Sequence, residues 1–316
     1  MTDWAERFSG VPRYAGVATF ARLPAAVNPE GLDVAIFGVP YDSATTYRSG
    51  ARHAPAAIRA VSGLLREYHP WWNVSPFDAL RVGDLGDVPV VPAYIEQTQH
   101  VIQDWTAGVL EAGAFPLAMG GDHSVTLPLL RAAAGKSGTL SLLQFDSHPD
   151  TWTSEHGQPL GHGTPIRRAI EEGLIDARAS VQVGIRGSVD AAGDLDEARA
   201  LGLRLIQTDE AAALGVPGVL NVVQETLRGP IYVTLDIDAA DPSCAPGTGT
   251  PEVGGFTARE MLGLVRGLRD LPIVGFDLVE VCPAHDAGEI TALLAANLMY
   301  EIICLLACRE CKASAT

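Results

Sequence analysis

Residues 140–150 read Leu-Ser-Leu-Leu-Gln-Phe-Asp-Ser-His-Pro-Asp, a mostly apolar run that passes directly into acids and a histidine. A run of this length without regular polar alternation is typical of a strand that is covered on both faces. We expect the strand at Leu140–Phe145. Further runs of the same kind predict strands at Val34–Val39, Phe115–Met119, Val181–Ile185, Arg204–Gln207, Ile231–Ile237 and Ile273–Leu278.

Longer segments with apolar residues at helical spacing lie between these runs. They predict helices at Ala54–Leu65, Ile95–Ala112, Thr257–Leu268 and Ile290–Ala307. The third segment begins with a capping box, Thr-Ala-Arg-Glu at 257–260. Strands that alternate with helices from end to end predict one doubly wound α/β domain with a largely parallel sheet. In such sheets the ligand site lies beyond the carboxyl ends of the strands, so residues that carry chemistry should follow the apolar runs directly.

The composition excludes several classes of protein. Of 316 residues, 38 are acidic and 22 are lysine or arginine, which gives a net charge of −16. Nucleic acids and anionic membranes need basic surface, so neither is an expected partner. No uncharged apolar run is long enough to span a membrane, because Glu301 interrupts the longest candidate. The first residues lack a signal sequence, and Cys304 and Cys308 are expected to be buried thiols, so we expect a reducing cytoplasmic location.

Four of the apolar runs end in acid and imidazole groups. The motifs are Gly-Gly-Asp-His-Ser at 120–124, Asp-Ser-His-Pro-Asp at 146–150, Asp-Ile-Asp at 236–238 and Asp-Leu-Val-Glu at 277–280. Side chains alternate along an extended chain, so the two aspartates and the histidine of 146–150 should converge, joined by 236 and 238 from a neighbouring strand.

Carboxylates packed in this way repel one another in a partly dry cleft, and two divalent cations would neutralise them. One such motif alone would be typical of a solvated loop, but the combination at strand ends indicates a metal site. Carboxylates with two histidines suit manganese best, while nickel would tolerate the same mixture and zinc stays open.

With these motifs the chain resembles the ureohydrolases, the superfamily of arginase and agmatinase. The resemblance covers essentially the whole chain and is closer to the agmatinase and guanidino-acid hydrolase branch. It implies a three-layer α/β/α fold with a central eight-stranded, mostly parallel sheet, in a single domain at 1–316 whose first 30 residues pack on the domain or on a neighbouring subunit. The matching stretches are Pro12–Tyr14, Gly38–Asp42, Gly120–Ser124, Asp146–Asp150, Asp236–Asp238, Asp241-Pro242, Ala245–Pro251 and Glu280–Pro283.

The resemblance also implies a ligand set for two metal ions. One ion would be held by His123, Asp146, Asp150 and Asp236, and the other by His148, Asp146, Asp236 and Asp238. Asp146 and Asp236 would bridge the two ions. The catalytic residues implied are His162 as the proton shuttle, Glu280 as the carboxylate that holds the guanidinium, and Asp150 beside the metals.

This constellation supports hydrolysis of a guanidino group. Two divalent ions can share one water molecule and lower its pKa, so that it attacks the weakly electrophilic guanidinium carbon near neutral pH. The leaving amine then needs a proton, and a histidine such as His162 titrates in the right range to supply it. Glu280 can accept two parallel hydrogen bonds from the guanidinium.

Two positions depart from the family pattern, and they bear on the substrate. Ser147 stands where the family usually has alanine and places a hydroxyl close to the metals, and Trp152 stands where smaller or polar residues are more common. Trp152 is interpreted either as a wall of the pocket that offers its ring to a cation or as a packing residue. The segment Thr151–Pro165, which should line the pocket for the substrate's tail, contains Glu155 and His156 but no lysine or arginine. These residues favour a cationic or neutral tail over a carboxylate.

We therefore expect a binuclear metal hydrolase of agmatinase type that releases urea and an amine from a small guanidino compound. The alternatives are a guanidinobutyrase or guanidinopropionase, and a hydrolase of guanidine or of an N-alkylated biguanide such as metformin. A one-metal deacetylase on the same fold would leave carboxylates uncompensated, and a silent subunit of a hetero-oligomer would not need the complete set of site residues. The resemblance implies a homo-oligomer, a trimer or a hexamer, with a hetero-oligomer as the alternative.

Overall fold

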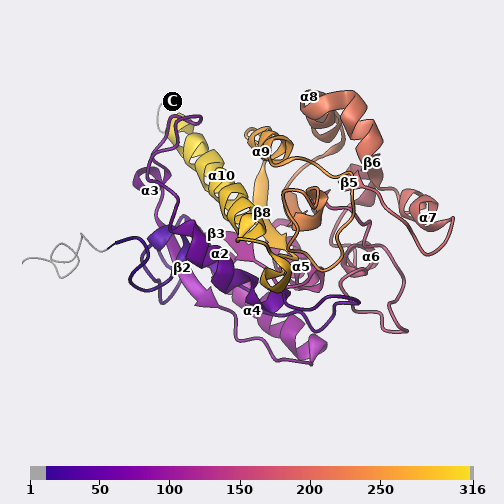
Figure 1. Cartoon of the computed structure of the whole chain (residues 1–316), viewed down its shortest axis with the longest axis horizontal. Coiled ribbons are helices and arrows are strands. Elements are labelled where there is room, and N and C mark those ends of the chain that lie inside the picture. Colours follow the sequence, from indigo (N-terminus) through magenta and orange to yellow (C-terminus); the bar gives the residue numbers. More distant parts are fainter. Residues whose placement is uncertain (1–11, 314–316) are drawn as a thin grey trace, which may run out of the picture.

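A computed structural model of the chain describes residues 12–313 (Figure 1). Within them, eight strands form one sheet in the order β2-β1-β3-β8-β7-β4-β5-β6. Each pairing of neighbouring strands in this sheet is parallel. The strands are β1 Val34–Gly38, β2 Val82–Asp87, β3 Phe115–Met119, β4 Ser141–Phe145, β5 Val181–Ile185, β6 Arg204–Gln207, β7 Ile231–Asp236 and β8 Ile273–Val279.

The seven predicted strands are all present, within one residue of the expected bounds at each end. The sequence analysis missed β2, whose residues Val-Gly-Asp-Leu-Gly-Asp lack an apolar run. This strand is the last in the strand order and pairs with β1, while on its other side it makes one isolated bridge, between Asp84 and Ala25. An edge strand needs less apolar surface than a central one, which explains why the pattern was absent.

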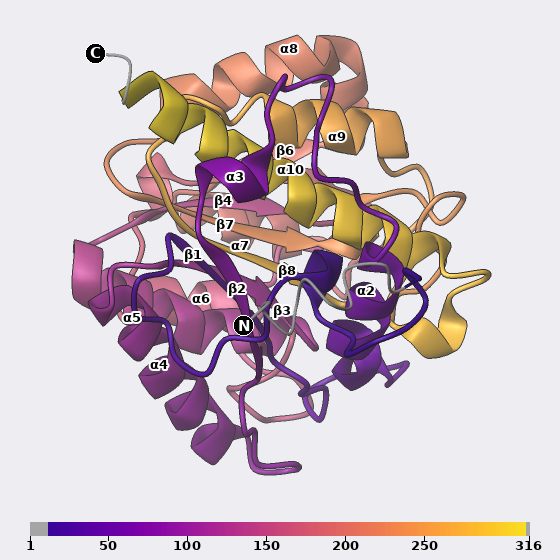
Figure 2. The same cartoon turned by 90° about the vertical axis from the view of Figure 1, so that its left-hand side faces the viewer.

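Helices cover both faces of the sheet, so the fold has the predicted three layers. In Figure 2 the helices α8, α9 and α10 lie above the strands, while α4 and α5 lie below them. The two buried apolar clusters correspond to these two faces. The helices are α2 Ala54–Ser62, α3 Pro76–Ala79, α4 Ile95–Glu111, α5 Thr126–Ser137, α6 Pro165–Glu171, α7 Asp194–Ala200, α8 Thr208–Thr226, α9 Ala258–Arg266 and α10 Ile290–Ala313.

The predicted capping box at the start of α9 is present. The Thr257 hydroxyl accepts a hydrogen bond from the Glu260 backbone N–H, and the Glu260 carboxylate accepts one from the Thr257 backbone N–H. The predicted helix at 54–65 is shorter than expected and ends at Ser62. Five helices of the described residues were missed: α3, α6 and α7 have only 4, 7 and 7 residues, and α5 and α8 do not show a sharp separation of apolar and polar faces. The predicted helix at 290–307 continues to Ala313.

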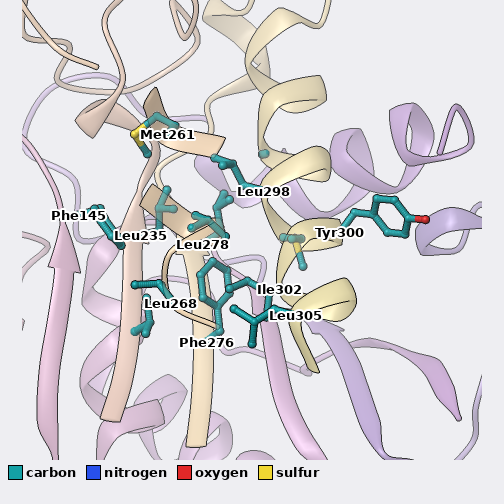
Figure 3. Packing of buried hydrophobic residues seen from close by; sticks show 14 of the residues in the cluster. Phe145, Leu235, Met261, Leu268, Phe276, Leu278, Leu298, Tyr300, Ile302 and Leu305 are labelled. Atoms are coloured by element: carbon teal, nitrogen blue, oxygen red, sulfur yellow. The ribbon is translucent and has the colours of Figure 1, made fainter. Parts of the chain in front are cut away.

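Helix α10 crosses the middle of the sheet and supplies much of the core. Figure 3 shows Leu298, Ile302 and Leu305 of this helix facing Phe276 and Leu278 of β8. All five side chains are fully buried. Burial of side chains of this size stabilises the fold by about 1.5–3 kcal/mol each relative to exposure.

By length and composition alone, α10 could cross a membrane, but 78% of its most apolar window is buried inside the protein. Glu301 lies in that window and is itself buried, where its carboxylate meets His69, Trp72 and Arg266. A buried carboxylate is costly unless it is paired, so these contacts with protein groups are consistent with α10 being a core helix of a globular fold.

Part of the predicted N-terminal extension lies at residues 1–11, outside the described residues. The part that is described packs on the domain through Phe20, whose side chain is fully buried. The Phe20 backbone N–H donates to Asp84 Oδ2 at 2.8 Å, and the same oxygen accepts from Arg59 Nε at 2.8 Å. One buried ion pair therefore joins this segment to β2 and α2.

Candidate metal centre and its cavity

The four central strands β3, β8, β7 and β4 are neighbours, so their carboxyl ends meet at one place. His123 follows β3 and contributes Nδ1, which lies 3.0 Å from Asp146 Oδ2, 2.8 Å from Asp150 Oδ2 and 3.5 Å from Asp236 Oδ2. The ligand atoms of His123, Asp146 and Asp236 lie within 4.8 Å of one another, which is close enough to hold one ion.

A second group of ligand atoms adjoins the first. His148 Nδ1 lies 3.0 Å from Asp238 Oδ2 and 3.6 Å from Asp146 Oδ1. The atoms of Asp146, His148 and Asp238 form a separate set that could hold a metal ion. Because Asp146 belongs to both sets, two ions would share this carboxylate, as the sequence resemblance implies.

The ligand candidates converge through tight turns, and the predicted strand alternation is wrong for this detail. β4 ends before Asp146, whose carboxylate accepts the His148 backbone N–H at 2.6 Å. Asp150 has a φ of 51°, an uncommon conformation for a residue with a side chain. Asp236 caps a short 3-10 helix by accepting the Asp238 backbone N–H at 2.8 Å. The carboxylates of Asp146 and Asp236 therefore stabilise, through these hydrogen bonds, the turns in which they lie.

The electrostatics of the cluster favour a bound cation. Burial and the neighbouring Asp146 raise the pKa of Asp150 to about 7. Burial and Asp238 also raise the pKa of Asp236 well above its usual range. Two buried atoms in the cluster, His123 Nδ1 and Asp238 Oδ2, have no hydrogen-bond partner. Divalent cations would supply the missing partner and the missing positive charge, so the residues fit such ions.

A chain of two buried amides supports the shared carboxylate, and the sequence analysis missed it. Gln144 Nε2 donates to Asp146 Oδ2 at 2.6 Å, and Gln182 Nε2 donates to Gln144 Oε1 at 2.6 Å. The same amide of Gln182 donates to Pro149 O at 2.6 Å. The pair thus fixes both the Asp146 carboxylate and the turn at 146–150 from β4 and its neighbour β5.

A second support lies under His123. The His123 Nε2 atom is 2.9 Å from Thr234 Oγ1, and this hydroxyl donates to Asp277 Oδ1 at 2.6 Å. A proton on Nε2 leaves Nδ1 free as a ligand atom, which is the usual arrangement behind a metal-binding histidine. Asp277 therefore lies beneath the cluster and supports it from behind, although it stands in one of the acidic motifs.

Glu280 and His162 form a pair beside the cluster. His162 Nδ1 lies 2.9 Å from Glu280 Oε1, and the same oxygen accepts the His123 backbone N–H at 2.9 Å. Glu280 Oε2 is buried without a hydrogen-bond partner, and the residue has a φ of 64°. Backbone strain of this kind concentrates at functional sites. Burial lowers the pKa of His162, but the adjacent Glu280 carboxylate outweighs it and raises the pKa to about 10.

The close packing at Glu280 depends on a glycine. Gly121 O accepts the Glu280 backbone N–H at 2.8 Å, which ties the end of β8 to the Gly-Gly-Asp-His motif. A Cβ at Gly121 would lie 1.7 Å from Tyr41 O, so no other residue fits at this position. Glycine at 121 therefore lets three segments meet within reach of His123.

A cavity of about 440 Å³ adjoins the cluster and is the expected place for a substrate. The predicted tail-pocket residues Trp152, Glu155 and His156 all line it. Glu155 is more constrained than expected, because its Oε2 accepts the Gly163 backbone N–H at 3.0 Å and its Oε1 lies 3.7 Å from His162 Nε2. Ser154, from the segment predicted to line the pocket, and Thr250, from the quoted stretch at 245–251, also line the cavity. The residues absent from the sequence analysis are Thr46, Ser188, Val189 and Asp190.

The remaining predictions about the cavity concern charge. None of the described residues that line it is lysine or arginine, whereas Glu155 and Asp190 are acids. Arg52 is paired with Asp42, and Arg48 stacks on the Tyr47 ring at 5.4 Å. The Ser147 hydroxyl lies 3.0 Å from His148 Nδ1, close to the cluster as predicted.

A histidine and aspartate cluster that could hold metal ions, beside a cavity at the carboxyl edge of a parallel sheet, is typical of metal-dependent α/β enzymes. The chain belongs to the arginase family, whose sequence model matches residues 32–305. It is 48% identical over 299 residues to a guanidinopropionase from Pseudomonas aeruginosa, covering 94% of each chain. It is 43% identical to the mitochondrial agmatinase of Gallus gallus, covering 94% of this chain and 87% of the relative.

A solved structure gives the same result for the fold. The chain superposes on the proclavaminate amidino hydrolase from Streptomyces clavuligerus with a TM-score of 0.89 and 42% identity. The match covers 94% of this chain and 99% of the other. The arginase-like architecture predicted from the motifs is confirmed.

Proposed function

We propose that the protein hydrolyses the guanidino group of a small compound to urea and an amine, with two divalent ions held by the six predicted ligands. The observation that carries this proposal is the pair of three-residue ligand sets that share Asp146. Family membership and the names of the relatives support the same reaction class. The ligands are His123, Asp146, His148, Asp150, Asp236 and Asp238.

The residues beside the cluster have separate roles in the proposed reaction. When bound, the two ions would lower the pKa of a water molecule and so supply a nucleophile near neutral pH. The unpartnered Glu280 Oε2 faces no competing donor among the described residues, so it can accept a guanidinium N–H. His162 is a suitable acid for the leaving amine, because Glu280 favours its protonated form.

Manganese is the proposed metal, with nickel as the alternative. The ligand set is rich in carboxylate oxygen with two imidazole nitrogens, a mixture that manganese accepts readily. A homo-oligomer in the cytoplasm, a trimer or a hexamer, completes the proposal. The motivation for the location is the small number of cysteines, of which Cys304 and Cys308 are buried in α10.

For the tail of the substrate we propose a cation or a neutral group, as in agmatine. A carboxylate tail would lose its water in a cavity that offers no lysine or arginine, at a cost of roughly 1–3 kcal/mol. Glu155 and Asp190 would attract an ammonium group instead. Trp152 lines the same cavity and can offer its ring face to a cation.

The second candidate is a guanidino-acid hydrolase. It is supported by the 48% identity to a protein named guanidinopropionase. In that case a cation from outside the cavity, such as Arg48 or a group on a neighbouring subunit, would have to pair with the carboxylate. The relatives reported above are not named for guanidine or a biguanide, and neither is proposed as the substrate.

The decisive experiment measures urea release from agmatine, 3-guanidinopropionate and 4-guanidinobutyrate by manganese-loaded and nickel-loaded protein. We expect the highest kcat/KM with agmatine. A clear preference for either acid would refute the proposed tail pocket but keep the reaction class. No urea from any of the compounds, with both metals bound, would refute the proposed reaction.

A further inference from the structure

Thr46 is an exposed residue of the loop between β1 and α2, and it lies against the imidazole of His162. Its backbone N is 3.1 Å from His162 Nε2, and its Oγ1 is 2.8 Å from the same atom. Both residues line the cavity. No motif of the sequence analysis included Thr46.

The contact of His162 Nδ1 with Glu280 determines which of the two ring nitrogens changes its protonation. Nδ1 lies 2.9 Å from Glu280 Oε1, and an ionised carboxylate can only accept a hydrogen bond. Nδ1 therefore carries a proton in both states of the ring. The proton that comes and goes during catalysis is the one on Nε2, the atom that Thr46 contacts.

Thr46 offers a partner for each state of Nε2. Its backbone N–H can donate to the lone pair of the neutral ring, and its hydroxyl oxygen can accept the N–H of the imidazolium. We propose that Thr46 is a positioning residue for His162. The Thr46 hydroxyl stabilises the imidazolium and connects His162 Nε2 with solvent in the cavity. This inference rests on the proposed function, in which His162 is the proton shuttle.

The loop that carries Thr46 is fixed relative to His162. Asp122 Oδ2 accepts the Ala44 backbone N–H at 2.9 Å, and Ala44 O accepts the His162 backbone N–H at 3.3 Å. Asp122 is fully buried and precedes His123 at the end of β3. The same motif that presents a metal ligand therefore also positions the contact of Thr46 with the shuttle histidine.

The charged groups around His162 do not replace the hydroxyl. Glu280 contacts Nδ1, and Asp122 acts on the ring through its charge without a hydrogen bond. Glu155 faces Nε2, but its nearest oxygen lies at 3.7 Å, beyond hydrogen-bond distance, while its other oxygen is bonded to Gly163 N. Among the described residues, only Thr46 lies within hydrogen-bond distance of Nε2.

The proton transfer balances at each atom. A protonated buffer molecule or hydronium gives one proton to Thr46 Oγ1 as the hydroxyl gives its own proton to His162 Nε2. The bond between that proton and its donor breaks as a new Thr46 O–H bond forms, and the original Thr46 O–H bond breaks as the Nε2–H bond forms on the ring. The imidazolium later gives one proton to the leaving amine and returns to its neutral state.

The test compares Thr46→Val, which removes the hydroxyl but keeps the shape and the backbone N–H, with Thr46→Ser, which keeps the hydroxyl. Thr45→Val is the matched control, because the Thr45 hydroxyl donates to Asp42 O at 3.0 Å and not to His162. In the manganese-loaded protein we expect Thr46→Val to lower kcat about tenfold with little change in KM. Thr46→Ser and Thr45→Val should keep kcat close to that of the unmodified protein.

The pH dependence separates this role from a purely structural one. Without the hydroxyl the imidazolium loses its acceptor, so the pKa of His162 should fall by about one unit in Thr46→Val. The alkaline decline of kcat, where the acid form is lost, should shift to lower pH by the same amount. Thr46→Ser should retain the original profile.

Imidazole NMR titration of the metal-loaded proteins measures the His162 pKa without turnover, with His162→Ala used to assign the signal. An unchanged His162 pKa in Thr46→Val, or the same change in Thr46→Ser, would overturn the inference. Loss of bound metal in Thr46→Val would also overturn it, by showing that the residue holds the fold of the site. If the unmodified protein released no urea while the titration shift occurred, the proposed reaction would fail and the Thr46 contact would stand.

Discussion

The metal-ligand candidates at the strand ends and the loop residues on the other side of the cavity differ in how their side chains are held in place. In the cluster, Asp146 and Asp236 are buried and fixed by backbone N–H groups of the turns that they cap. In the wall, His156 and Asp190 lie on loops and are exposed. The comparison indicates that the reaction class depends on a rigid part of the fold, whereas the choice of substrate depends on loops that can vary at little cost in stability.

The largest expected effect is on the rigid side of this comparison. Asp236→Ala should remove a carboxylate that lies 3.5 Å from His123 Nδ1 and that would help to hold the two proposed ions. We expect loss of at least one metal ion per subunit and of nearly all activity, measured by elemental analysis and urea release. Asp209→Ala, an exposed acid on α8, is the control. Full occupancy of both sites in Asp236→Ala would remove this residue from the ligand set.

The next effect separates the proton shuttle from the metal ligands. His162→Ala should keep both ions but lower kcat by about 10²-fold, the usual scale for loss of a general acid. In the unmodified protein, kcat should fall as the pH rises through the pKa of His162, about 10, because only the imidazolium can donate a proton. The variant should lack this decline. A normal rate would transfer the role to another group, and His156→Ala in the same cavity tests that alternative.

A third variant tests whether support from behind the cluster matters. Gln144→Met keeps the volume of the side chain but removes the N–H that donates to Asp146 Oδ2. Metal affinity should fall about 10- to 100-fold, as for other groups that orient metal ligands, and excess metal should restore activity. Gln224→Met, at an exposed position on α8, is the control. Equal metal affinity of Gln144→Met and the unmodified protein would contradict this role.

The smallest effect concerns the loop wall. Asp190→Asn removes an exposed acid from the cavity, and exposed charges contribute only about 0.2–1 kcal/mol. The ratio of kcat/KM for agmatine to that for 4-guanidinobutyrate should therefore fall by about twofold to fivefold. Asp196→Asn, an exposed acid on α7 that contacts Arg199, should leave the ratio unchanged. A higher ratio of agmatine to 4-guanidinobutyrate activity in Asp190→Asn would contradict the proposal that acids in the cavity attract a cationic substrate tail.

Seven of the eight described strands and the clustering of acids and histidines at strand ends were predictable because they follow from local patterns, whereas the assignment of ligands to two ions came from the family resemblance. Continuous apolar runs mark buried parallel strands, and the acids that follow them reach the same edge of the sheet. The amide chain from Gln182 to Gln144 was not predictable, since glutamine in an apolar strand has no pattern that indicates its partner. Its hydrogen bonds depend on β5 lying next to β4, which is a property of the strand order.

The sequence by itself determined the fold class, the family and the cluster of acids and histidines. Only the tertiary structure decided what meets His162, because Thr46 and Glu280 are 116 and 118 residues away from it along the chain. Their loops carry no hydrophobic periodicity, so nothing local encodes the distance between them. The physical reason is that parallel strands bring distant loops to one edge of the sheet, where buried groups such as Asp122 and Gly121 then fix each loop in place.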